Sequence, residues 1–210
     1  LGPLQPYFGR ALHVPHLERV EGVALSPSAD WAGLAAALRR QGFAVLDAAL
    51  QPRVLESIVG YFLDATIWYA SHPAGHLLLA QLHDGLHAEI LLQVASELLS
   101  RMPPEVREHR LTDIVAHKHD TEARGSAQPE AQAAPAAFSA AIWTTPAVAN
   151  LDSSGNGFEI LPAELPGASL RDGAAEASKV AYRQNRLVLL RADRSCRSAL
   201  NPRRWRAGYR

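Results

Sequence analysis

The sequence predicts an α+β domain in which the helices come first and the strands follow. In the first half of the chain, apolar residues recur at the three- and four-residue spacing of amphipathic helices. From about residue 111 onward, short apolar pieces of strand length are separated by Gly, Pro, Asn and Asp. This order is typical of helices that buttress one face of an antiparallel sheet or sandwich.

The predicted helices have recognisable starts and ends. Ser28 or Asp30 can cap the first helix, Gly42 ends it, and Pro52 suits the first turn of the second. The three helices are expected over residues 30–41, 52–70 and 86–101. Prolines and glycines break up residues 1–27, which we expect to form an irregular N-terminal arm.

The strand predictions rest on short apolar runs bounded by turn residues. They cover residues 43–47, 111–119, 137–143, 158–161, 180–183 and 186–191. Alanine is abundant over 123–149 and favours helix over strand, which weakens the prediction there. After the arm we expect one domain over 28–210, with a helical part (28–104) and a strand-rich part (105–210).

Composition limits the classes of function. The chain is 48% hydrophobic and 20% charged, and its 21 Lys and Arg balance its 21 Asp and Glu. A neutral chain does not favour a nucleic-acid or anionic-membrane partner, and we expect a small-molecule or protein partner instead. A single cysteine, Cys196, excludes an internal disulfide, and we interpret it as a plain thiol. No targeting or spanning segment is recognisable, which favours a cytoplasmic location.

The nine histidines suggest metal chemistry, but all of them lie within the first 119 residues. His117 and His119 alternate on a predicted strand, so both project from the same face. With Asp120 they could hold zinc or another divalent cation. The alternative is that both imidazoles are hydrogen-bonded within or at the rim of a sandwich, without metal.

Several phrases of the sequence, in this order and spacing, resemble one family. They are GFAVLD (42–47), DATIWY (64–69), HKHD (117–120), RG (124–125), WTTP (143–146), ANLD (149–152), GFEI (157–160), YRQNR (182–186) and RAGY (206–209). The set is similar to bacterial 2-oxoglutarate/Fe(II)-dependent oxygenase-like proteins. The resemblance implies a double-stranded β-helix, a jelly-roll or cupin-like sandwich, backed by the N-terminal helices. It also implies Fe(II), held by an HxD pair and a distal His, and 2-oxoglutarate.

The chain departs from the family where the iron ligands belong. The HxD positions fall on Gln132 and Ala134 when counted back from the WTTP phrase, or near 128–130 when counted forward from RG. The distal His is expected within 194–200, where none occurs. The final strand, with its oxoglutarate-binding Arg, would follow Arg210, so we expect a fragment or a truncated copy.

We therefore expect a degenerate dioxygenase-like domain without catalytic residues, resident iron or bound 2-oxoglutarate. The alternatives are a non-catalytic binding or scaffold jelly roll, or a divalent-metal-binding protein that uses His117 and His119. The resemblance places four pocket candidates near the sheet interior, namely Trp143, Asn150, Arg183 and Asn185. The arginine-rich C-terminal segment has two interpretations, an anion-binding surface or, as we favour, a solvated tail whose covering strand is missing.

Overall fold

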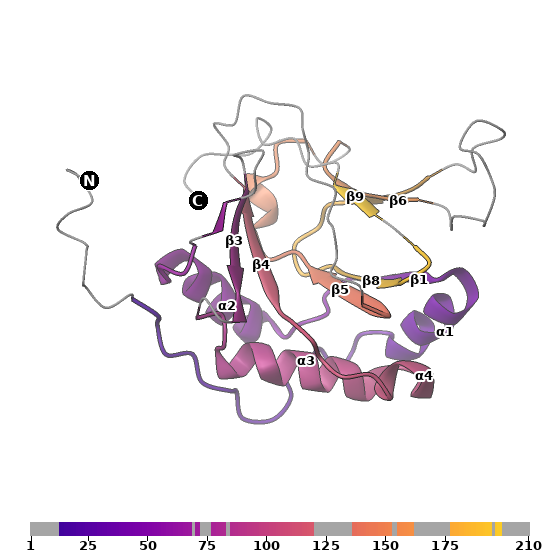
Figure 1. Cartoon of the computed structure of the whole chain (residues 1–210), viewed down its shortest axis with the longest axis horizontal. Coiled ribbons are helices and arrows are strands. Elements are labelled where there is room, and N and C mark those ends of the chain that lie inside the picture. The colour runs from indigo at the N-terminus through magenta and orange to yellow at the C-terminus, as the bar shows by residue number, and fades with distance from the viewer. Residues whose placement is uncertain are drawn as a thin grey trace.

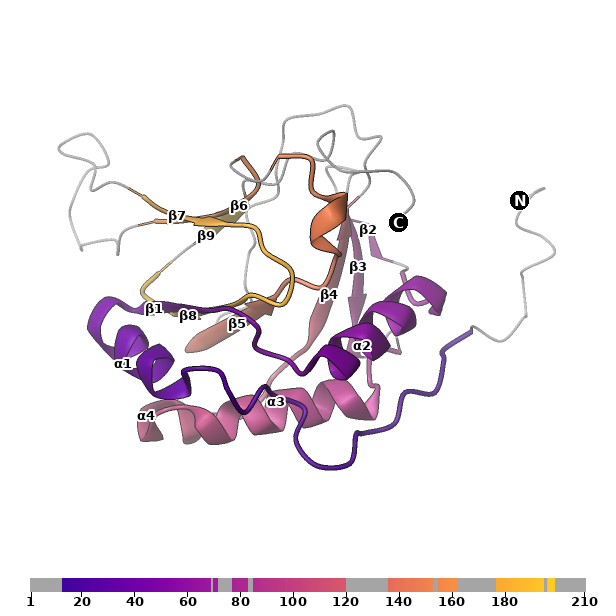
Figure 2. The same cartoon turned by 180° about the vertical axis from the view of Figure 1, so that it is seen from behind.

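The computed structural model describes residues 13–68, 70–71, 77–82, 85–119, 136–152, 155–161, 177–194 and 196–198. It confirms an α+β protein, with antiparallel sheets and a few helices (Figures 1 and 2). The helices are α1 (Trp31–Gln41), α2 (Pro52–Asp64), α3 (Glu89–Arg101), α4 (Pro104–Arg107) and the 3-10 turn η3 (Ala147–Ala149).

Within the described residues the strands form three sheets of three. The first has the order β1-β8-β5, with β1 (Phe43–Leu46), β8 (Leu187–Arg191) and β5 (Phe138–Ile142). The second has the order β2-β3-β4, with β2 (Ala70–Ser71), β3 (Leu77–Gln81) and β4 (Val115–His119). The third has the order β7-β6-β9, with β7 (Ser178–Ala181), β6 (Gly157–Ile160) and β9 (Cys196–Ser198).

The first predicted helix is confirmed together with its ends. The Asp30 carboxylate accepts a hydrogen bond from the Gly33 amide at 2.8 Å, which caps α1. Gly42 ends α1 at a φ of 74°, a backbone conformation that glycine adopts without strain. Trp31 and Leu38 are buried on its inner face.

The second predicted helix ends earlier than expected, at Asp64 rather than residue 70. Beyond Asp64 the backbone pairs with the N-terminal arm, because the Thr66 amide donates to the His13 carbonyl at 2.9 Å. Ile67 is fully buried there. Tertiary contacts therefore override helical spacing after α2.

The N-terminal arm is irregular from residue 13 onward, as predicted, but it is part of the core. Ala24 and Leu25 are fully buried, and Leu25 forms a bridge with Leu50. A buried backbone needs hydrogen-bond partners, and α3 supplies them. The Glu97 carboxylate accepts from the amides of Ala24 and Leu25 at 2.9 and 3.0 Å, and Gln93 pairs with the backbone of Val20.

All six predicted strands occur with small shifts of their ends, as β1 and β4–β8. Strands β2, β3 and β9 were not predicted. The run of three leucines in β3 carries no alternation, and the three residues of β9 include a single apolar side chain. Such segments become strands through pairing with a neighbour rather than through their own pattern.

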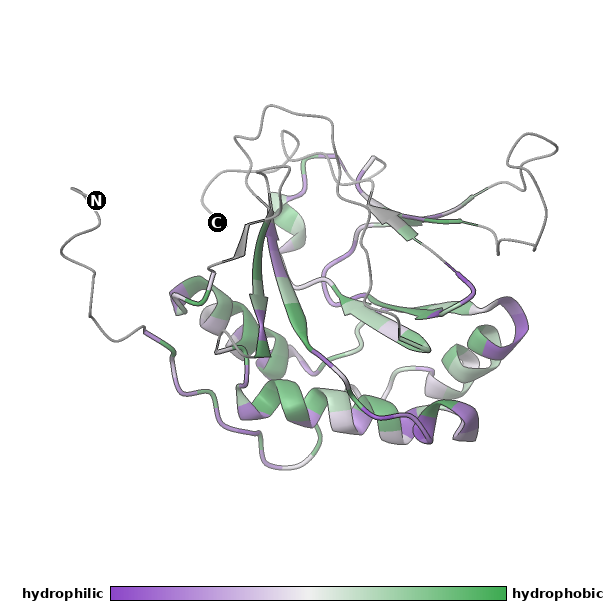
Figure 3. Cartoon of the chain, viewed as in Figure 1, coloured by the Kyte–Doolittle hydropathy of each residue, from purple (hydrophilic) through white to green (hydrophobic). Residues whose placement is uncertain are grey.

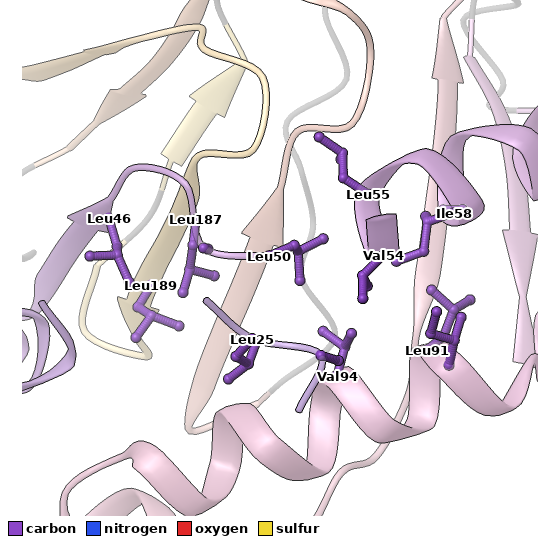
Figure 4. Close-up of a cluster of buried hydrophobic side chains, with 14 of the residues drawn as sticks. Leu25, Leu46, Leu50, Val54, Leu55, Ile58, Leu91, Val94, Leu187 and Leu189 are labelled. Atoms are coloured by element: carbon purple, nitrogen blue, oxygen red, sulfur yellow. The ribbon is translucent and has the colours of Figure 1, made fainter. Parts of the chain in front are cut away.

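Strand β8 is buried on both faces, which makes it the centre of a layered arrangement. Val188 and Leu190 face β6 and β7, where they cluster with Ile160. Leu187 and Leu189 face the helices and join the main core, as Figure 4 shows. This explains why β8 reads as a continuous apolar run.

The main core lies where the helices cover the strands (Figure 4). Ala80 on β3 and Ala116 on β4 belong to the same cluster as the buried residues of α2 and α3. Figure 3 shows hydrophobic residues along much of α3 and β3, and hydrophilic residues on α4. Among the described helices, none has both the length and the hydropathy needed to cross a bilayer.

Candidate functional site

Three of the four predicted pocket residues meet at one turn. The turn of residues 182–186, called here the corner turn, joins β7 to β8 and contains Arg183 and Asn185. The third residue, Trp143, follows β5 and pairs with this turn through its backbone. The Asn185 amide donates to the Trp143 carbonyl at 2.8 Å, and the Trp143 amide donates to the Arg186 carbonyl at 3.2 Å.

The charged centre of the corner turn is a residue that the sequence did not single out. The Asp47 carboxylate, just after β1, accepts from Arg186 Nε at 2.6 Å and Nη2 at 3.0 Å. It also accepts from Arg183 Nη1 at 2.8 Å. Hydrogen bonds from Arg186, and then its charge and Arg183, hold the pKa of Asp47 below its usual range although burial opposes them.

Asn185 connects the corner turn to the loop of Ala49 and Leu50, which is far away in the sequence. Its amide group donates to the Leu50 carbonyl and accepts from the Leu50 amide, each at 2.8 Å. Its own carbonyl accepts from the Ala49 amide at 3.0 Å. The φ of Asn185 is 62°, in the left-handed region that Asn tolerates better than most residues. The side-chain amide is thus engaged with the fold rather than presented to a ligand.

Trp143 packs with other aromatic rings between the two facing sheets. Its ring centroid lies 4.8 Å from that of Phe158 and 5.0 Å from that of Tyr182. The Tyr182 hydroxyl donates to the Thr145 carbonyl at 2.6 Å, and burial raises the pKa of this phenol. Tyr182 therefore stays protonated at neutral pH and serves as a buried donor.

The fourth predicted residue, Asn150, lies in a neighbouring loop. Its side-chain oxygen accepts from the Asp152 amide at 3.0 Å and from Asn156 Nδ2 at 2.7 Å. The Asn156 carbonyl accepts in turn from the Tyr182 amide at 2.8 Å. Asn150 is therefore connected to the corner turn through Asn156, and its hydrogen bonds hold the loop before β6.

The His117 pair lies on a strand, as predicted. Both His117 and His119 belong to β4, opposite Leu79 and Leu77 of β3, and alternation places them on one face. His117 is exposed. Asp120 and the side chain of His119 lie outside the described residues. Within the described ranges, no group of three or more His, Cys, Asp and Glu residues could hold a metal ion.

The resemblance calls for iron ligands in two segments of the chain. Residues 128–134 lie outside the described ranges. In the distal segment, β9 holds Cys196, whose half-buried thiol packs against the Val188 cluster, and burial raises its pKa. No histidine occurs in the 91 residues after His119. The side chains present do not fit a centre of two imidazoles and a carboxylate.

A second cluster, formed by a lysine and two aromatic rings, was not predicted from the sequence. Lys118 Nζ lies 5.4 Å from the ring centroid of Trp68, which contacts Phe62 edge-on. Burial lowers the pKa of Lys118. Trp68 Nε1 is buried and finds no hydrogen-bond partner in the described part of the chain. The sequence offered one signal, the apolar Ala116 two positions before Lys118 on the same predicted strand. The other apolar neighbour, Leu78, lies opposite Lys118 on β3, which was not predicted.

The fold is thus a mixed α+β arrangement of three antiparallel sheets, with the helices packed against part of the strands in the main core. No family model, curated protein or solved structure matches this chain.

Proposed function

We propose that this chain is a degenerate 2-oxoglutarate/Fe(II) dioxygenase-like jelly roll that serves as a scaffold and does not oxidise a substrate. The pairing of its strands supports the jelly roll. Strands β5 and β8 share one sheet, while β6, β7 and β9 share another. From β5 to β9 the chain therefore passes back and forth between two facing sheets (Figure 2). Such winding is typical of double-sheet jelly rolls.

The single observation that supports the loss of catalysis is that the polar groups around the corner turn form hydrogen bonds with other parts of the fold. The Asn185 amide bonds to Leu50, the Tyr182 hydroxyl bonds to Thr145, and each of the three Arg186 guanidinium nitrogens donates to Asp47 or to the Ala181 carbonyl. Between the sheets, Ile160, Val188 and their neighbours pack as an apolar core. Groups committed to structure do not position a reacting molecule.

The donor set supports the same proposal. A facial iron triad needs three ligands on one side of the metal with open positions on the other. With no imidazole after His119, the strand-rich part beyond β4 lacks the nitrogen donors that the resemblance implies. A role in binding or scaffolding does not need them.

The decisive test measures 2-oxoglutarate turnover. The untagged chain is incubated with Fe(II), ascorbate and 2-oxoglutarate, and succinate is quantified against a metal-free control. We expect no succinate above the control and no saturable shift in melting temperature with 2-oxoglutarate. Iron-dependent succinate formation would overturn the proposal.

A second candidate is favoured by the shared face of His117 and His119 on β4, which can present two imidazoles to a divalent cation. It predicts near-stoichiometric zinc in protein purified without a histidine tag, and loss of that zinc in His117→Ala. The matched control is His87→Ala, an exposed histidine before α3. Zinc content near zero in the unmodified chain rejects this candidate.

A further inference from the structure

Strands β4 and β5 each form the edge of a sheet, and they lie next to each other. β4 ends the order β2-β3-β4 and β5 ends the order β1-β8-β5, so the two are not paired with each other among the described strands. Both views show them side by side and running in the same direction (Figures 1 and 2). They also share one core, since Ala116 of β4 belongs to the main cluster and Phe138 and Ile142 of β5 pack against it. We call the facing edges of β4 and β5 the β4–β5 seam.

The two strands begin at the same end of the molecule. His109, in the segment that leads into β4, has its ring centroid 5.3 Å from that of Phe138, the first residue of β5. The strand pairs that the structure describes are all antiparallel. A strand placed at the seam would therefore continue both sheets in the same manner, by running antiparallel to β4 and to β5.

The pairing of β5 with β8 determines which of its backbone groups face the seam. The Ala192 amide donates to the Ala137 carbonyl at 2.9 Å, directly before β5 begins. Every second residue from Ala137 onward therefore points its backbone groups toward β8. The N–H and C=O groups of Phe138, Ala140 and Ile142 point the other way, toward the side of β4. No hydrogen bond within the described ranges uses these groups.

The edge of β5 is accessible and lacks the usual protection of a strand edge. Ala140 is exposed, although it lies on the same face as Phe138 and Ile142, which pack against the core. Natural strand edges are commonly protected by charged residues, by proline or by a bulge. The sequence of β5, FSAAI, contains neither a charged residue nor proline. Such an edge is a template on which another strand can pair.

Insertion at the seam restricts the kind of partner. The inserted strand must offer backbone donors and acceptors on both of its edges, whereas a strand within a folded sheet has at most one free edge. An extended segment of a polypeptide has both edges free. On the side of the helices it would lie beside Ala116 and Ala140, whose small side chains leave room for valine or leucine. On the other side, exposed His117 and half-buried Ser139 suit polar residues.

We propose that the β4–β5 seam receives an extended segment of a partner polypeptide, with alternating apolar and polar residues, as a strand antiparallel to both β4 and β5. Backbone hydrogen bonds supply the affinity, and alternate side chains supply the specificity. The inference rests on the proposed scaffold role and adds to it the class of partner. The two fail separately, because succinate formation would reject the loss of catalysis, whereas the experiments below examine only the seam.

The probe is a fluorescein-labelled peptide of about nine residues, in which valine and threonine alternate between terminal lysines. It is titrated with the full chain, and binding is followed by anisotropy. We expect saturable binding, and affinity about tenfold lower for Ala140→Pro, which removes an amide at the seam but none that pairs with β8. The matched control is Val45→Pro on β1, at the opposite edge of the same sheet. Since the Arg191 amide donates to the Gly42 carbonyl, the Val45 amide also points away from β8, and we expect unchanged affinity.

Two N-methylated versions of the peptide test insertion without any change to the protein. Methyl groups on every second amide remove the donors toward one neighbouring strand, and a shift of the pattern by one residue removes those toward the other. Insertion between β4 and β5 predicts that both versions bind about tenfold more weakly than the unmodified peptide. If one version binds as tightly as the unmodified peptide, the strand adds to a single edge and the proposal is overturned.

Amide hydrogen exchange followed by NMR identifies what lies at the seam. In the free chain we expect fast exchange at Phe138, Ala140 and Ile142 and slow exchange at the residues between them, which bond to β8. Saturating peptide should slow the first three. The competing occupant is a segment outside the described residues, such as the arginine-rich residues 199–210. Slow exchange along all of β5 without peptide would indicate that occupant and overturn the proposal, as would the absence of saturable binding.

Discussion

Asp47 and Arg186, which are 139 residues apart in the sequence, form a two-point ion pair at 2.6 and 3.0 Å. The pair ties the end of β1 to the corner turn, where the Arg186 side chain is only 18% exposed. Arg186 also donates to the Ala181 carbonyl, so one guanidinium connects β1, β7 and β8. Such planar two-point pairing favours arginine over lysine.

Replacing Asp47 tests this connection and its pH dependence. We expect Asp47→Asn to lower the free energy of unfolding at pH 7 by about 1 kcal/mol, a modest value because the carboxylate is partly exposed and screened. The folded-state pKa of Asp47 is lowered, so its contribution is complete above about pH 4 and disappears as the pH falls through the folded-state value. Urea unfolding at pH 7 and pH 3 measures the difference.

The control for this prediction is Asp64→Asn, which removes an exposed carboxylate at the end of α2. We expect little change from it at either pH. A difference between the native chain and Asp47→Asn that stays constant down to pH 3 would contradict the assignment to a charged pair.

Asn185 combines a left-handed backbone with two hydrogen bonds to Leu50, and two substitutions separate these effects. Asn185→Ala removes the two hydrogen bonds and places alanine in a left-handed conformation that it adopts less readily than asparagine. We expect it to lower the free energy of unfolding by about 3 kcal/mol. Asn185→Gly loses the side chain but relieves the backbone, and we expect it to cost about 1 kcal/mol less. Guanidinium unfolding compares the two, and a glycine variant no more stable than the alanine variant would exclude a contribution from the backbone.

Glu97 holds the N-terminal arm against α3 through the Ala24 and Leu25 amides. Burial raises the pKa of Glu97, but these amides and the Gln93 side chain outweigh it, and the pKa is lowered overall. We expect Glu97→Ala to lower stability by about 2 kcal/mol, because two amides lose their acceptor. Tryptic cleavage after Arg19 should become faster, as the arm opens more often. Glu56→Ala, on the exposed face of α2, is the control that should leave cleavage unchanged.

Lys118 can be examined directly because the chain contains only one other lysine, Lys179. Reductive methylation with ¹³C-formaldehyde gives one side-chain NMR signal for each lysine, and Lys118→Met assigns them. Burial against Trp68 predicts a titration midpoint for Lys118 below the usual lysine value of about 10.4. A midpoint at or above that value would show that the amine is not desolvated.

The predicted site residues were partly brought together by the fold. Trp143, Arg183 and Asn185 meet at the corner turn, where hydrogen bonds connect each of them to a neighbouring segment, and their role as pocket residues stays a prediction. Asp47 was missed because its importance depends on two arginines from the other end of the chain. The metal-site prediction for His117 and His119 remains a prediction, as does the one for Asp120.

Local pattern determined the three longer helices, six of the strands and the absence of imidazoles after β4, because side-chain periodicity and residue identity are properties of neighbouring positions. Only the tertiary structure decided that α2 stops at Asp64, that β3 and β9 exist, and that Asp47 meets Arg186. Each of these depends on a partner far along the chain, as Thr66 depends on His13. Spacing cannot encode such a partner, since hydrogen bonds and ion pairs form between groups that become neighbours only after the sheets have paired.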